Sequence, residues 1–237
     1  MPPADLPTID QLVLDRFPDF HVLVLLAEDV AGGASTDASL AVLRDAEQEQ
    51  RAAFGSSPAS THPHIAAWRR AYGRFGAKPS RYPCSAEALL KRTLKGESLP
   101  AVNRLVDVYN AISVRRVLPV GGEDADRISG EQRLTFASTL EDAGESAEGS
   151  VPGDEVVWAD AEGITCRRWN WRQEPRTQLT EATHNALFVL ECLDPYPLAS
   201  LDVAGQELAQ TLVEQGPSAR VEAWLLPERR RVGMSGD

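Results

Sequence analysis

Residues 99–110 read LPAVNRLVDVYN, and residues 118–124, after one further helical stretch, read LPVGGED. We expect the first stretch to form a helix, because its proline lies near the start, where a helix tolerates proline. This helix would deliver a polar pair, Tyr109 and Asn110, to one site. The two glycines of the second stretch predict a tight turn that brings bare backbone to the same place, since about ten residues separate the two features. Together they indicate a ligand pocket.

The composition favours one domain with a substantial core. The chain has 237 residues, of which 43% are hydrophobic and 25% are charged. We expect a single domain over residues 1–226 and a charged, disordered tail over residues 227–237. The formal net charge of −11 argues against a DNA partner and against broad contact with RNA phosphates, which requires clusters of Lys and Arg. Any contact with RNA is therefore expected to be local.

Cysteine and histidine usage gives no sign of a metal or cofactor. Cys84, Cys166 and Cys192 are widely spaced and odd in number, which is not typical of a disulfide framework or a CxxC metal site. The four histidines have no Cys or carboxylate at ligand spacing. The N-terminus lacks a signal sequence, and no apolar run approaches the ~20 residues of a membrane helix. We expect a soluble, cytoplasmic protein that binds no metal or cofactor and does not enter a membrane.

Periodicity and chain breakers predict the remaining elements. Further helices are expected over residues 37–54, 63–72, 86–94 and 198–215. Strands are expected over residues 11–14, 20–27, 126–136, 155–160, 164–169 and 183–193, with an acidic surface loop over 141–153. The run 20–27 is apolar at nearly every position, which suits a strand buried on both faces. Because helices and strands are segregated along the chain, the predicted fold class is α+β, with layered helices on a mixed or antiparallel sheet.

Residues 105–110, LVDVYN, resemble a motif of the B3/B4 domain, the tRNA-binding and editing module of the phenylalanyl-tRNA synthetase β subunit. The pattern of that family is LVDxTN, then eight residues, then PxHAFD. Asn110 and Pro119 stand here with the same spacing, whereas Tyr109 replaces the threonine and Gly121 replaces the histidine. The resemblance covers about residues 68–193 and is strongest over 99–130.

This resemblance implies a layered α+β fold, a freestanding member without a synthetase catalytic core, and a tRNA or its aminoacylated 3′ end as partner. It places Asn110 in an amino-acid pocket. Thr183 resembles the threonine before the last pocket strand of the family, which is followed six residues later by a glutamate. Here that later position is Val189, so the acidic residue of the family is displaced or lost; the nearest carboxylates are Glu181 and Glu191.

The residues alone leave two interpretations of the helix and of the glycines. By spacing, Asp107 would pair with Arg104 or a loop amide, and Asn110 would cap the helix end. Gly121 and Gly122 would either supply the positive φ of a turn or let a substrate carbonyl approach backbone N–H groups, as in an oxyanion hole. The resemblance favours the pocket for Asn110, and both roles of the glycines can hold together.

Residues 167–172, RRWNWR, form the most concentrated basic and aromatic segment of an acidic chain. If this segment is a strand, its side chains alternate between two faces. It is then either an edge strand with core tryptophans or an RNA-binding strand, on which guanidinium groups hold phosphates and an indole stacks on a base. The candidate RNA-binding residues are Arg167, Arg168, Trp169, Asn170 and Arg172.

A second basic stretch precedes the third predicted helix. Arg70, Lys78 and Arg81 alternate with aromatic residues, so they predict either a second wall of an RNA channel or a solvated helix face. A triad of Ser85, Asp160 and His184 is conceivable, but nothing in the sequence brings these residues together, and Ser85 is expected to cap a helix.

Two functional hypotheses remain. The first is a trans-acting editing hydrolase, whose pocket of Tyr109, Asn110, Gly121, Gly122 and Thr183 receives the amino acid of a mischarged tRNA. The second is a non-catalytic RNA- or amino-acid-binding module that has lost the editing residues. The replaced histidine favours the second hypothesis, whereas the polar pocket favours the first.

Overall fold

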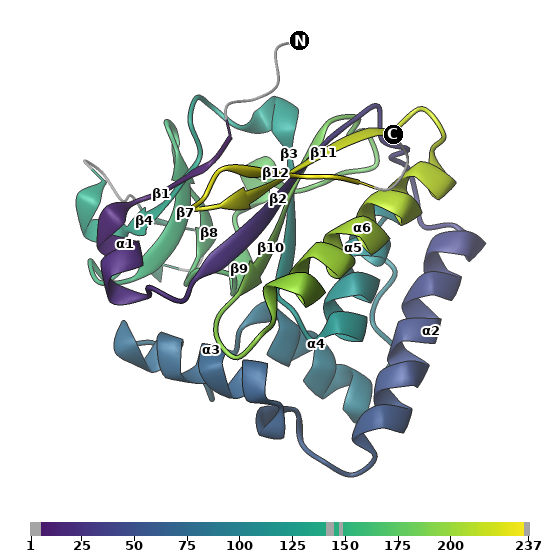
Figure 1. Cartoon of the computed structure of the whole chain (residues 1–237), viewed down its shortest axis with the longest axis horizontal. Coiled ribbons are helices and arrows are strands. Elements are labelled where there is room, and N and C mark those ends of the chain that lie inside the picture. The colour runs from purple at the N-terminus through teal and green to yellow at the C-terminus, as the bar shows by residue number, and fades with distance from the viewer. Residues whose placement is uncertain (1–5, 141–144, 147–148, 235–237) are drawn as a thin grey trace.

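Two five-stranded sheets lie at the centre of the molecule (Figure 1). The computed structural model describes residues 6–140, 145–146 and 149–234. One sheet has the strand order β12-β11-β2-β10-β3 and is antiparallel throughout; the other has the order β1-β4-β7-β8-β9, in which only the β1–β4 pair is parallel. The strands are β1 (Thr8–Ile9), β2 (His21–Glu28), β3 (Val120–Asp124), β4 (Arg133–Phe136), β5 (Glu145–Ser146), β6 (Gly149–Ser150), β7 (Val156–Asp160), β8 (Gly163–Arg167), β9 (Arg172–Gln173), β10 (Ala186–Cys192), β11 (Arg220–Leu226) and β12 (Arg230–Val232).

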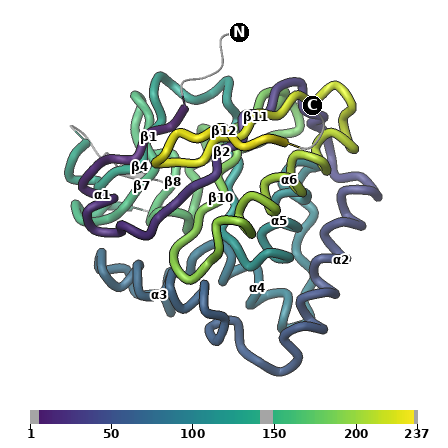
Figure 2. The backbone as a smooth tube through the Cα atoms, in the orientation of Figure 1, coloured from purple at the N-terminus to yellow at the C-terminus, as the bar shows by residue number. Residues whose placement is uncertain are grey.

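The longer helices gather beside the antiparallel sheet. α6 packs against β2, β10 and β11, and α5 lies between α6 and α2 (Figure 2). The helices are α1 (Gln11–Arg16), α2 (Asp37–Phe54), α3 (Pro63–Arg74), α4 (Ser85–Leu94), α5 (Arg104–Arg116) and α6 (Leu198–Gln215), with short 3-10 helices η1 (Ala59–Thr61), η2 (Ala125–Arg127), η3 (Ala137–Thr139) and η4 (Pro175–Thr177). This layered arrangement confirms the α+β prediction. No helix in the described ranges combines the length and apolar character needed to cross a membrane.

Strand β2 is buried on both faces, as its continuous apolar sequence predicted. Val22 and Val24 belong to the core between the two sheets, whereas Leu23 and Leu25 belong to the core under α5 and α6. α6 comes close to this strand at Gly205, where a Cβ atom would lie 2.2 Å from Leu23 Cδ2. One strand therefore separates the two main cores and fixes the sheet on which the helices rest.

Helix α5 carries the LVDVYN motif and is fixed at its N-terminal end. It begins at Arg104 because the Asn103 side chain accepts a hydrogen bond from Val106 N at 2.9 Å. Buried Asp107 accepts from Ser39 Oγ at 2.9 Å and from the Val102 amide at 3.2 Å, so the predicted pairing with a loop amide is confirmed. The helix ends at Arg116, and Val117 reverses the chain with a φ of 50°.

Several predicted elements are confirmed and others are wrong. Helices over 37–54 and 198–215 have the expected bounds, and strands β7 and β8 form the expected hairpin. Residues 11–14 were expected to form a strand but belong to helix α1, in which Val13 is the buried residue. The predicted loop over 141–153 lies partly outside the described residues. Residues 230–232 are not a disordered tail: they form β12, which pairs with β11 and buries Val232.

Candidate functional site

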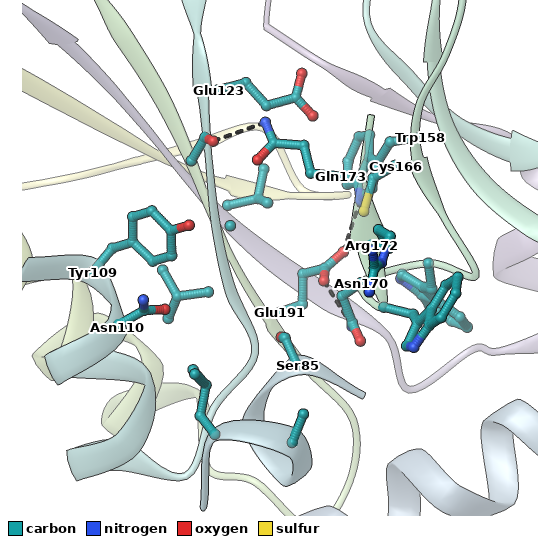
Figure 3. A pocket seen from close by; sticks show the side chains of 18 residues that line it. Ser85, Tyr109, Asn110, Glu123, Trp158, Cys166, Asn170, Arg172, Gln173 and Glu191 are labelled. Carbon is teal, nitrogen blue, oxygen red and sulfur yellow. Dashed lines mark hydrogen bonds between the residues drawn. The ribbon is translucent and has the colours of Figure 1, made fainter. Parts of the chain in front are cut away.

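A chamber of about 250 Å³ lies where α4, α5 and the two sheets meet (Figure 3). Two of its walls come from separate parts of the fold. Strands β3 and β10 form one wall, and the turn between β8 and β9 forms another. The lining residues are Ser85, Ala88, Leu89, Tyr109, Asn110, Val120, Gly121, Gly122, Glu123, Trp158, Cys166, Trp169, Asn170, Trp171, Arg172, Gln173, Val189 and Glu191. The structure thus brings together the helix and the glycine stretch on which the pocket prediction depended.

Tyr109 and Asn110 project from α5 toward the chamber (Figure 3). Asn110 lies in the middle of the helix, so the hypothesis that it caps the helix is wrong. No hydrogen bond joins its amide to another of the chamber side chains, all of which are described. Burial raises the pKa of Tyr109 to about 12, so its hydroxyl stays neutral at physiological pH. The two residues present uncharged hydrogen-bonding groups to the chamber.

Gly121 and Gly122 lie in strand β3, so the predicted glycine turn is wrong. Neither has a positive φ. Gly121 pairs with Val189 of β10, and Gly122 pairs with Phe188. A Cβ atom at position 122 would lie 2.7 Å from Leu179 Cδ1, so glycine is needed there to let the core close over the strand. The chain reversal between α5 and β3 is made by Val117 instead.

The hydrogen-bond pattern of β3 limits which backbone groups a ligand can reach. The Glu191 amide donates to the Pro119 carbonyl at 3.0 Å, so alternate residues of this segment, including Gly121, direct their N–H and C=O groups to β10. The N–H and C=O groups of Gly122 therefore point away from β10, at the open edge of the sheet. There, Gln173 Nε2 donates a hydrogen bond to the Gly122 carbonyl at 3.0 Å. An oxyanion hole built from both glycine amides does not fit this arrangement.

Glu191 is a chamber residue that the sequence reasoning did not assign. It follows Val189 by two positions on β10, so both side chains lie on the same face. The side chain accepts hydrogen bonds from Trp158 Nε1 at 2.9 Å and from Asn170 Nδ2 at 2.8 Å (Figure 3). Burial raises the pKa of Glu191 to about 7, against the lowering effect of these donors. Strand alternation from Val189 is the signal that would have identified it.

A second buried acid, Glu123, lies at the other end of the same chamber. It is 6% exposed and accepts a hydrogen bond from Gln132 Nε2 at 2.7 Å. Burial raises its pKa to about 7 as well. Groups with such values exchange protons near neutral pH, which general acid–base catalysis requires. Both carboxyl groups are therefore candidates for proton transfer.

Segment 167–172 is a turn, so the prediction of a continuous strand is wrong. Strand β8 ends at Arg167, and Arg168 and Trp169 have φ values of 46° and 65°. Arg167 is fully buried and forms an ion pair with Glu155, with an Nε–Oε1 distance of 2.5 Å. Trp169 is fully buried with its ring centroid 4.9 Å from that of Phe20. Neither residue can bind RNA phosphates or bases from solution, which corrects that prediction.

Four residues of the segment line the chamber, namely buried Trp169 together with Asn170, Trp171 and Arg172, whereas Arg168 packs beside it. The Arg168 guanidinium carbon lies 3.9 Å from the Tyr82 ring centroid and 4.6 Å from the Trp171 ring centroid, and this side chain is only 11% exposed. Asn170 is held by Glu191 and by Tyr72, whose hydroxyl donates to Asn170 Oδ1 at 2.8 Å. Of the three arginines in this segment, Arg172 alone is an exposed residue, and its guanidinium lies 5.2 Å from the Trp171 ring centroid.

The remaining candidates lie outside the chamber. Arg70, Lys78 and Arg81 are exposed on and after α3 and do not line it. Thr183 was expected in the pocket, but it is buried elsewhere and donates to Asp124 Oδ2 at 2.7 Å. Its role in this structure is to hold the loop before β10.

The structure does not assemble the other constellations considered. Ser85 lines the chamber as the first residue of α4, whose N-cap is Cys84. His184 is exposed, and Asp160 pairs with Arg176 at 2.6 Å, so no triad with Ser85 forms. Within residues 6–140, 145–146 and 149–234, no group of three or more His, Cys, Asp or Glu side chains is arranged to hold a metal ion.

Comparison with known proteins identifies the family. None of the curated proteins compared matches this sequence. Among solved structures, an N-terminal fragment of the phenylalanyl-tRNA synthetase β subunit from Pyrococcus horikoshii aligns with 96% of this chain, at 10% identity and a TM-score of 0.45. The alignment covers 57% of that fragment. The model of the B3/4 domain family matches residues 67–202, which is more than half of the chain and contains all the residues that line the chamber. The chain belongs to the B3/4 domain family.

Proposed function

We propose that this protein binds the aminoacylated 3′ end of a tRNA and hydrolyses the ester that links the amino acid to the terminal ribose. The observation that carries the proposal is Glu191, a buried acid with a pKa of about 7 that lies in one small chamber with Tyr109 and Asn110. The motif around Asn110 and membership of the B3/4 family support the same substrate. A tRNA substrate implies a cytoplasmic protein.

The size of the chamber supports an amino acid as the part of the ligand that enters. A volume of about 250 Å³ suits one amino-acid side chain and its ester group and excludes the body of a tRNA. Its wall mixes aromatic rings with a few polar groups, so a side chain can be selected by hydrogen bonds that a wrong substrate leaves unpaired. Tyr109 and Asn110 line the chamber and would make that selection.

The phosphates of the tRNA would remain outside the chamber. Arg172 is exposed at its wall, and Arg70, Lys78 and Arg81 are exposed farther along the chain. These four cations are few in a chain with a net charge of −11. We therefore expect few phosphate contacts and a shallow dependence of tRNA affinity on salt.

The proposed hydrolysis uses Glu191 as the general base. Its carboxylate accepts a proton from a water molecule, whose oxygen forms a bond to the ester carbonyl carbon. The Asn110 amide donates a hydrogen bond to the carbonyl oxygen as that oxygen becomes negative. The bond between the carbonyl carbon and the ribose oxygen then breaks, and the proton passes from Glu191 to the ribose oxygen. The products are the free amino acid and the uncharged tRNA.

A non-catalytic binding module is the second candidate. Gly121 occupies the position of the histidine in the motif that the sequence resembles, and the chamber lining contains no histidine. A protein of this kind would bind the charged 3′ end and leave the ester intact. The two candidates differ in one measurable product, the uncharged tRNA.

The test is a deacylation assay with the full chain. Correctly charged and mischarged tRNAs are incubated with the protein, and loss of the ester is followed against incubation without protein. Hydrolysis of one mischarged species, reduced by about 10²-fold or more in Glu191→Gln, supports the proposal. Binding without hydrolysis of any tRNA supports the binding module, and the absence of both binding and hydrolysis contradicts both candidates.

A further inference from the structure

A second hollow of about 590 Å³ adjoins the chamber. It lies between one face of α5 and its preceding loop, with Val102 and Val106, and the segment 171–179 that contains η4. We call this hollow the valine groove. The groove and the chamber share four wall residues, Tyr109, Trp171, Arg172 and Gln173. The two hollows therefore adjoin along these four side chains, so a ligand bound in the chamber can extend past them into the groove.

From this continuity we propose that the valine groove binds the terminal adenosine of the ligand whose amino acid enters the chamber, with Arg172 at the 5′-phosphate of that nucleotide. This inference rests on the proposed function, since it gives the nucleoside part of the same substrate its own subsite. It assigns a direction of approach along α5 and away from the basic residues that follow α3.

The shape of the groove fits a planar ring next to a sugar phosphate. Its α5 side is apolar, and Val102 is 53% exposed at its edge, where its side chain is accessible to a ligand. Its other side offers the Pro175 ring and the side-chain amide of Gln178. Stacking on apolar or aromatic surfaces together with a few amide contacts is the common way in which proteins hold unpaired bases.

Trp171 is held in a position that keeps the groove open. The Arg168 guanidinium packs on this indole at 4.6 Å, and the Tyr82 ring centroid lies 5.0 Å from that of Trp171. These two side chains line neither hollow, so they pack on a part of Trp171 away from the chamber and the groove, both of which the indole lines. The nucleoside is therefore directed toward the α5 side.

Two charged side chains line the groove, Glu174, which is 9% exposed, and Arg172, which is the more exposed of the two and faces solvent. Arg172 is an exposed cation at the junction of chamber and groove, 5.2 Å from the Trp171 ring centroid. A guanidinium in this place can contact a phosphate while the nucleoside lies over the neighbouring apolar wall. Arg70, Lys78 and Arg81 line neither hollow.

The test uses adenosine 5′-monophosphate as a probe of the full chain, measured by calorimetric titration. Val102→Glu places a negative charge on the exposed edge of the groove and is expected to weaken binding about tenfold or more by repulsion of the phosphate. Val203→Glu is the matched control, because Val203 is 45% exposed on α6 and lines neither hollow. Equal binding by these two variants would overturn the proposal, as would the absence of any binding by the wild-type protein at millimolar probe.

A second pair of variants tests the direction of approach. Arg172→Gln should weaken binding of adenosine 5′-monophosphate several-fold, whereas Arg70→Gln should leave its affinity unchanged. The reverse result would put the nucleotide on the α3 side and overturn the proposal. If Val102→Glu instead converts a wild-type dimer to a monomer in sedimentation, the groove is an interface between copies of the chain, which also overturns it.

The outcome is distinguishable from that of the proposed function. If the probe binds and Val102→Glu weakens its binding while no charged tRNA is hydrolysed, the proposed nucleoside groove is supported and the proposed hydrolysis is contradicted. If charged tRNA is hydrolysed and Val102→Glu changes neither the affinity for the probe nor the KM for that tRNA, the function stands and the groove is overturned.

Discussion

The two ends of the RRWNWR segment have opposite environments. Arg167 and Trp169 are fully buried, one in an ion pair with Glu155 and the other among aromatic rings. Asn170 and Arg172, a few residues farther along the same segment, line the chamber together with buried Trp169. The two residues with positive φ, Arg168 and Trp169, turn the chain and send neighbouring side chains in opposite directions. Residue type alone therefore did not predict which of these side chains lie at the chamber. The direction of the backbone at Arg168 and Trp169 determines it.

The largest expected effect lies at the buried end. Arg167→Met leaves the Glu155 carboxylate, which is 3% exposed, without its closest cation. Breaking a buried ion pair by removing one partner costs about 3–5 kcal/mol, so the free energy of unfolding should fall by that amount in urea titrations. The matched control is Arg172→Met, at an exposed position, with an expected change within about 0.5 kcal/mol. Similar losses in the two variants would remove the distinction between the two ends.

A pH dependence of stability follows from Glu191. Its pKa is about 7 in the folded protein and has an ordinary value of 4.5. As pH rises through this window, the unfolded chain has already released the proton that the folded chain still holds, so the free energy of unfolding falls by about 1.4 kcal/mol per pH unit. Glu191→Gln lacks this titration.

The stability of Glu191→Gln minus that of the wild type should therefore increase by about 3 kcal/mol between pH 4.5 and 7 and stay level above pH 7. Urea titrations of both proteins at half-unit steps measure this difference, and a constant offset from the lost hydrogen bonds does not affect its pH dependence. A difference that is the same at pH 4.5 and pH 7 would show that Glu191 ionises normally and would weaken its assignment as the base.

Replacing Arg168 should have an effect on stability between those of replacing Arg167 and Arg172. Its guanidinium packs on Tyr82 and Trp171 but is not fully buried. Cation–π contacts of this kind contribute about 0.5–2 kcal/mol, so Arg168→Met should lower the free energy of unfolding by about 1 kcal/mol. Its effect on the salt dependence of tRNA binding should be smaller than that of Arg172→Met. The reverse order would mean that Arg168 contacts phosphate.

The smallest stability effect and a clear binding effect are expected at Arg172. Arg172→Ala should change the free energy of unfolding by less than about 0.5 kcal/mol, since the side chain is exposed. The slope of log tRNA affinity against log salt should become shallower by about one or less. An unchanged slope together with a marked loss of stability would show that Arg172 has a structural role, as Arg167 has.

Much of the fold was predictable because its signals are local. The capping box at Thr36 and the break at Gly55 fixed α2, and continuous apolar character identified β2. The glycines of β3 were misassigned, since the requirement for glycine at position 122 comes from Leu179 and Phe188, which are distant in sequence. Residues 230–232 were also misassigned, because their strand depends on pairing with β11.

The site was predictable in part for the same reason. Tyr109 and Asn110 come from one helix and a recognisable motif. Glu191 was missed because the motif pointed to Val189; strand alternation puts both side chains on one face of β10, and the structure shows that this face lines the chamber. Thr183 was misplaced because its partner, Asp124, lies on a strand that the sequence did not predict.

The most direct test of the account is the Asn110→Asp variant in the deacylation assay. Aspartate keeps the size of the side chain but removes both amide donors and adds a negative charge to a chamber that already contains Glu191. Because position 110 lies in the middle of α5 and has no hydrogen bond to another chamber side chain, the free energy of unfolding should change by less than about 1 kcal/mol. We predict that the variant folds normally and neither hydrolyses charged tRNA nor binds its 3′ end. Wild-type activity in this variant would contradict the assignment of the chamber as the functional site.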